Sequence, residues 1–152
     1  MSSFTGNPSA MVKLVGHTAV TQVATTVEDI TDTNWIDCSQ FEFLLLSVVV
    51  NAVATPGTGT IKWLENATNG VSGSSAVKDA AGTDLSLSMG TPAAGDARLF
   101  ELRCTGRKKF ISPQLVISAG TMDVVVVIHG VGVRDTNEIP ALSTLATAKT
   151  IN

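Results

Sequence analysis

The sequence contains no tyrosine, and phenylalanine and tryptophan bring its aromatic fraction to only 5%. Exposed aromatic rings are the usual stacking platforms for bases and sugars, so this scarcity argues against such a surface. Charged residues are also few, at 15% against about 25% in a typical protein. The net charge is −3, whereas nucleic-acid-binding proteins usually carry a basic stripe. The composition therefore predicts no nucleic-acid partner.

Cysteine and histidine, which serve most metal and nucleophilic sites, occur twice each, as Cys38, Cys104, His17 and His129. The cysteines lack Cys-x-x-Cys spacing and are expected to be reduced, buried thiols. Neither histidine lies at a recognisable spacing from a nucleophile or further ligands. We therefore expect no catalytic residue, no metal, no cofactor and no enzymatic activity.

Long hydrophobic segments are missing as well. The apolar runs at residues 43–50 and 122–128 are far shorter than the ~20 residues that a membrane helix needs. The first residues lack a basic segment followed by an apolar core, so no export signal is expected. These features predict a protein made in a cytoplasm, with no membrane association.

The sequence does contain many residues that favour strands. Residues 41–50 (FEFLLLSVVV) form the longest apolar run, which predicts a strand buried on both faces. Short strand-like segments recur between turn signals, and no helical periodicity extends over a helix-length window. We predict an all-β fold, a two-sheet antiparallel β-sandwich of jelly-roll type.

Several local features refine this expectation. Residues 55–60 predict a Pro/Gly turn between two strands, and residues 97–104 alternate as a half-buried strand. Pro113 cannot donate a backbone hydrogen bond, so its strand is expected to be an edge strand or to be bulged. Residues 122–133 predict a second long apolar strand.

The chain divides into three parts by composition. Residues 1–10 are polar around Phe4 and predict an extended N-terminal arm. Residues 11–134 predict one β-sandwich domain, a size that suits a single core. Residues 135–152 predict a C-terminal arm, which is expected to become ordered only against a partner.

Polar clusters offer a few alternative sites. The acidic residues Glu28, Asp29, Asp32 and Asp37 do not match a calcium loop, so they predict a solvated loop. The cluster Arg107-Lys108-Lys109 predicts either a solvated hairpin end that protects an edge strand or a contact with an acidic partner.

Two further motifs have both a structural and a functional interpretation. Asn66-Ala67-Thr68 matches a glycosylation sequon, which is expected to be irrelevant without export. Trp35 and Trp63 are expected to be core residues, with a sugar-stacking role as the alternative.

A family resemblance is carried by a series of segments across residues 20–134. These are residues 35–38 (WIDC), 41–50, 61–65 (IKWLE), 76–83 (AVKDAAGT), 100–103 (FELR) and 122–133. Their order and loop composition resemble small β-sandwich proteins of tailed bacteriophages, in particular capsid decoration (cement) proteins.

The resemblance implies a structural virion protein on the outer surface of an icosahedral phage head, made in the host cytoplasm. It would bind the major capsid protein, bridge capsid subunits and form a homotrimer. The residues expected to contact a partner are Phe4, Arg107, Lys108, Lys109, Ile139, Leu142 and Leu145. The alternative is a phage tail or baseplate subunit, or a glycan-binding receptor module.

Overall fold

Two long strands, β4 (Phe43–Asn66) and β8 (Phe110–Val131), form the centre of the sheet. They run antiparallel, from Phe43 opposite Val131 to Asn66 opposite Phe110. The computed structural model describes residues 12–23, 27–29 and 35–132. Every strand in these ranges pairs with β4 or β8, so the two long strands organise the fold.

The shorter strands extend the sheet on both sides. Their bounds are β1 (Val12–Val23), β2 (Val27–Asp29) and β3 (Ile36–Asp37) beside β8, and β5 (Ser75–Ala76), β6 (Ser86–Gly90) and β7 (Ala97–Arg103) beside β4. A 3-10 helix, η2 (Cys38–Gln40), follows β3. All strand pairs are antiparallel, which confirms the predicted all-β class. None of the described helical residues forms a span that could cross a membrane.

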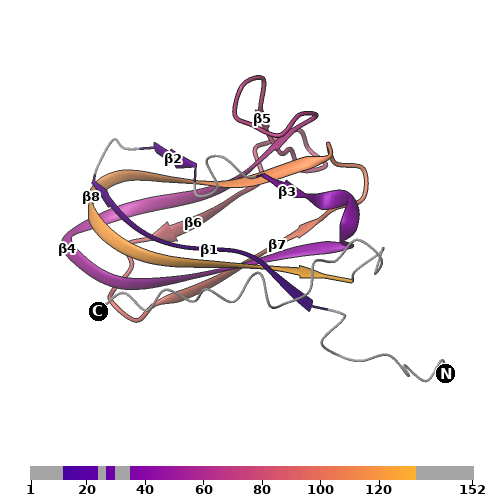
Figure 1. The fold of residues 1–152 in the computed structure, drawn as a ribbon. Coiled ribbons are helices and arrows are strands. Elements are labelled where there is room, and N and C mark those ends of the chain that lie inside the picture. Colours follow the sequence, from indigo (N-terminus) through magenta and orange to yellow (C-terminus); the bar gives the residue numbers. More distant parts are fainter. Residues whose placement is uncertain (1–11, 24–26, 30–34, 133–152) are drawn as a thin grey trace.

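Both long strands bend midway, so the sheet curls over itself (Figure 1). We call the first half-sheet β1, β7, residues 43–50 of β4 and residues 122–131 of β8. The second half-sheet contains the remaining halves of β4 and β8 with β2, β3, β5 and β6. The rings of Trp63 and Phe100, one from each half-sheet, lie 5.8 Å apart between centroids, so the core lies between the two halves.

The bend changes which residues face the core. In the first half-sheet the buried residues of β4 have even numbers, from Leu44 to Val50, whereas directly after the bend they are the odd-numbered Ile61 and Trp63. Leu64 and Asn66, at the end of the strand, are buried as well. Register shifts occur at several points between Val50 and Gly59. Because a one-residue shift moves side chains to the opposite face, these irregularities keep apolar residues on the concave side.

The predicted turn at residues 55–60 is therefore wrong, because β4 continues through it as a bent strand. Likewise, the strand predicted around Pro113 and the strand predicted at residues 122–133 belong to one bent strand, β8. At the bend the backbones approach so closely that a Cβ on Gly57 would lie 1.9 Å from the carbonyl oxygen of Ala119. Only glycine fits there, because any side chain would collide with the backbone of β8.

Pro113 lies in a central strand, and its pairing with β4 has no register shift at this point. The prediction of an edge strand or a bulge is therefore wrong, although the reason behind it holds locally. The Trp63 carbonyl opposite Pro113 accepts from Val77, away from β8, so the Pro113 nitrogen faces the other side. On that side β3 pairs with residues 110–111 and β2 with residues 114–116. Pro113 therefore occupies a gap between two paired segments, where no strand in the described ranges needs its missing donor.

The prediction that the strand at residues 41–50 is buried on both faces is also wrong. Leu44, Leu46, Val48 and Val50 are at most 1% exposed, but Val49 between the last two is 41% exposed. The odd-numbered side chains of β4 from Phe43 to Val49 face outward on the convex side of the first half-sheet, whereas Phe41, before the strand, is buried. This half-exposed apolar face is the most unusual feature of the fold.

Candidate interaction surface

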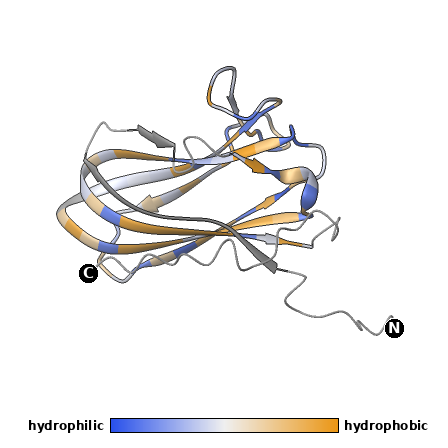
Figure 2. Cartoon of the chain, viewed as in Figure 1, coloured by the Kyte–Doolittle hydropathy of each residue, from blue (hydrophilic) through white to orange (hydrophobic). Residues whose placement is uncertain are grey.

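The outward-facing side chains of β7, β4 and β8 form four rows across the first half-sheet. The rows, set by the strand register, are Arg103–Phe43–Val131, Glu101–Leu45–His129, Leu99–Ser47–Val127 and Ala97–Val49–Val125. All are half-buried or exposed, and Leu99 reaches 66% exposure. We call these twelve residues the outer face. Eight of them are apolar, and apolar residues dominate this part of β4 and β8 (Figure 2).

The convex side of the second half-sheet has a different composition. Its outward residues are mainly hydroxyl, amide and charged groups, namely Thr60, Lys62, Ser86, Ser88, Gln114 and Ser118, with Val116 among them. A sheet with one side in water normally has polar residues on that side. The second half-sheet follows this rule and the first does not. The two convex sides are therefore adapted to different surroundings.

Strand β7 forms one border of the outer face, and in the described ranges it pairs with β4 alone. The Val50 amide donates to the Asp96 carbonyl, and the Cys104 amide donates to the Glu42 carbonyl. Because backbone groups alternate along a strand, even-numbered residues of β7 face β4 and odd-numbered residues face away. The amides and carbonyls of Leu99 and Glu101 thus point out from the edge, where another strand could pair.

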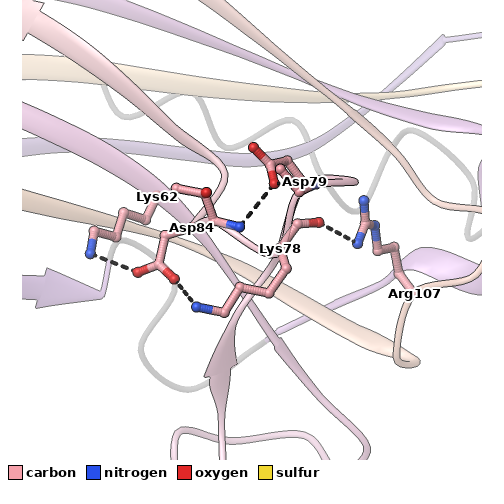
Figure 3. A network of polar contacts seen from close by, with 7 residues as sticks. Lys62, Lys78, Asp79, Asp84 and Arg107 are labelled. Atoms are coloured by element: carbon pink, nitrogen blue, oxygen red, sulfur yellow. Dashed lines mark hydrogen bonds and ion pairs between the residues drawn. The ribbon is translucent and has the colours of Figure 1, made fainter.

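The basic cluster lies at one end of the molecule, and each of its members contacts another part of the chain. Arg107 Nη1 donates to the Lys78 carbonyl at 3.0 Å (Figure 3), and Lys108 Nζ donates to Ser75 Oγ at 2.9 Å. Lys109 Nζ lies 3.4 Å from Asp37 Oδ2. These contacts tie the hairpin before β8 to β3, to β5 and to the loop after β5. A contact between this cluster and a partner remains a prediction.

Close to this end, Asp84 bridges two lysines (Figure 3). Its carboxylate accepts hydrogen bonds from Lys78 Nζ and, at 3.1 Å, from Lys62 Nζ. These two bonds, the one from Lys78 first, lower the pKa of Asp84 below its ordinary value. Asp84 thereby joins the loop before β6 to β4, although all three side chains are partly exposed.

The two cysteines come together although they are distant in sequence. Both side chains are buried, and Cys38 Sγ lies 3.7 Å from the Cys104 carbonyl oxygen. His129 lies on the outer face, and the side chain of His17 is outside the described part. No group of three metal-ligating side chains occurs within the described ranges.

The remaining sequence candidates have structural positions. Trp63 is fully buried and Trp35 is 4% exposed, so neither offers a ring to a sugar, as expected for core residues. Asn66 is buried and donates to the carbonyls of Gly70 and Ser72, so its amide nitrogen is not available for glycosylation. Asp37 caps η2 by accepting from the Ser39 amide.

Some predicted contact residues cannot be placed. Phe4, Ile139, Leu142 and Leu145 lie outside the described residues, as do Asp32 and both terminal arms. The outer face, in contrast, was not predicted. The sequence did contain a sign of it, because residues 43–50 and 124–128 are apolar at both odd and even positions. Such strands have two apolar sides, and each side is buried only if another layer covers it.

Comparisons with known proteins do not identify a family. No family model matches the chain, and no curated protein is significantly similar in sequence. One solved structure, described as "Bacillus endospore appendages form a novel family of disulfide-linked pili", is 14% identical, with a TM-score of 0.42. The match covers 80% of this chain and 88% of that chain. A similarity this low supports no conclusion about function.

Proposed function

We propose that this protein is a structural component of a phage virion, a decoration protein that binds the outer surface of an icosahedral head. In this proposal it contacts the major capsid protein, bridges capsid subunits and associates with its own copies as a homotrimer. The proposal extends the resemblance of residues 20–134 to cement proteins. The observation that supports it best is the apolar outer face on a body built from two long, bent strands.

A decoration protein needs a body that keeps its shape and a surface that other proteins can cover. Here β4 and β8 each pass through both half-sheets, so the halves are joined by continuous backbone as well as by side-chain packing. Exposed apolar patches on soluble proteins commonly mark contacts with other proteins. On a symmetric shell many weak contacts act together, so each one can be modest.

We further propose that the curled sheet is a two-sheet sandwich of jelly-roll type. The contact between Trp63 and Phe100 supports this, since the two rings come from opposite half-sheets. The core residues of both halves form one cluster, which includes Leu46, Ile61 and Val126. Packing of two apolar sheet faces about 10 Å apart is the defining feature of a sandwich.

The proposal also assigns the bridging of capsid subunits to the two terminal arms, which lie outside the described residues. Segments that become ordered on binding can wrap large surfaces. The alternative, a glycan-binding receptor module, would need a stacking ring other than Trp35 or Trp63, since both are buried.

The test is reconstitution of particles. Purified protein is mixed with heads that lack it, and the heads are pelleted and imaged by electron cryomicroscopy. We expect saturable binding to the outer shell and greater resistance of the heads to heat. Absence from the pellet, or density confined to the tail, would refute the proposal.

A further inference from the structure

We propose that the outer face is covered by a second copy of the same chain, packed sheet against sheet. This deepens the proposed function and rests on the self-association that it includes. Because the same face on two copies makes a two-fold contact, it joins chains in pairs, and the contacts within the proposed homotrimer are separate from it. The starting observation is the contrast between the two convex sides: one is lined by Ser, Thr, Gln and Lys, the other by Phe, Leu and Val. A sheet side of the second kind is normally buried.

Charge indicates what kind of partner fits. The outer face has one carboxylate, Glu101, and one permanent cation, Arg103, both at one end of β7, and its third ionisable residue is His129. A surface with balanced charge offers no particular attraction for a strongly acidic or basic partner. Two copies can therefore pack through this face without bringing together an excess of positive or of negative charge.

The area also suits a second copy. With strands about 4.8 Å apart and alternate residues about 6.8 Å apart, three strands with four outward residues each cover about 390 Å². Strand β1, which pairs with β8 beyond this face, widens it to four strands. Two such faces together give about 1,000 Å², close to the lower limit for a specific interface. We therefore expect reversible, concentration-dependent association.

Val49 and Val71 provide a matched test. Both are exposed valines, at 41% and 51%, but Val49 lies in the middle strand of the outer face and Val71 in the loop after β4. The full chain and the variants Val49→Lys, Leu99→Lys and Val71→Lys are compared by sedimentation velocity over a wide concentration range. Circular dichroism and unfolding midpoints select folded variants, and Val49→Ser, a smaller polar change in the same middle strand, stands in if Val49→Lys does not fold.

We expect the unmodified chain and Val71→Lys to associate equally. The two face variants should associate at least about tenfold more weakly, because a buried, unpaired ammonium group is strongly unfavourable. A chain that stays monomeric at every concentration would overturn the proposal. So would a folded Val49→Lys that associates normally, and loss of association in Leu99→Lys alone would indicate edge pairing through β7 instead.

Head binding separates this inference from the proposed function. If Val49→Lys is monomeric but the unmodified chain binds heads, both proposals stand. If the unmodified chain associates through the outer face but never binds heads, the self-association stands and the virion role fails.

Discussion

The ring of Trp63, on the second half of β4, packs against the ring of Phe100 on β7, with centroids 5.8 Å apart and planes inclined by 37°. The two residues are brought together by the curl of the sheet, since β7 pairs with the first half of β4. This contact reports directly on the packing of the two half-sheets.

Replacing Phe100 with alanine should therefore lower the free energy of unfolding by about 3 kcal/mol, through lost burial and the cavity left beside Trp63. Urea denaturation followed by tryptophan fluorescence measures this change. The control Val71→Ala, at an exposed loop site, should change stability by less than about 0.5 kcal/mol. Equal losses for the two variants would show that the curl does not depend on this contact.

The bend of β4 allows a comparison of two glycines. A Cβ on Gly57 would lie 1.9 Å from the backbone oxygen of Ala119, whereas on Gly59 it would lie 3.1 Å from the movable Ile117 Cδ1. We expect Gly57→Ala to cost about 3 kcal/mol and Gly59→Ala about 1 kcal/mol. Thermal unfolding of both variants tests the order, and a reversed order would contradict the close approach at the bend.

Asp84 should make stability depend on pH at the acidic end. Because Lys78 and Lys62 lower its pKa in the folded state, its contribution is present above the ordinary aspartate pKa of about 3.9. It is lost as the pH falls through the lower, folded-state pKa. The difference in unfolding midpoint between the unmodified chain and Asp84→Asn should be constant near neutrality and shrink in acid.

Salt provides a check on this prediction. Added salt should reduce the same difference, since the three side chains are partly exposed and screened. Glu101→Gln is the control, because Glu101 makes no ion pair within the described part of the chain. If Glu101→Gln shows the same pH dependence, the effect is one of net charge and not of the lysine bridges.

Asn66 should be sensitive to a change that preserves its shape. Its Nδ2 donates to the carbonyls of Gly70 and Ser72 at 2.6 and 2.9 Å. In Asn66→Asp both donors are lost and a carboxylate faces two carbonyl oxygens, so we expect a loss of about 2 kcal/mol in stability at neutral pH. Asn51→Asp, at an exposed position of β4, is the matched control and should be nearly neutral in denaturant titration.

The sequence predicted the parts of the fold that depend on local pattern. The alternation of Phe100 and Leu102 with charged residues correctly placed β7 and its buried side. The bend could not be predicted, because Pro56-Gly57 gives the same signal in a turn and in a bent strand. Which of the two forms depends on Ala119, a neighbour brought close only by the fold.

The candidate surface was missed for a similar reason. The run at residues 41–50 correctly indicated a strand, but its predicted burial on both faces was wrong. A single sequence does not tell whether the second apolar side is covered by the same chain. The bridge from Asp84 to Lys62 and Lys78 was equally hidden, since it depends on how the loop before β6 lies against β4.

The passage of β4 and β8 through both half-sheets has a consequence for unfolding. Neither half can be released while the other keeps its full ladder, because each contains a section of the same two strands. The protein should therefore unfold in one cooperative step, and a fragment containing only one half-sheet should not fold.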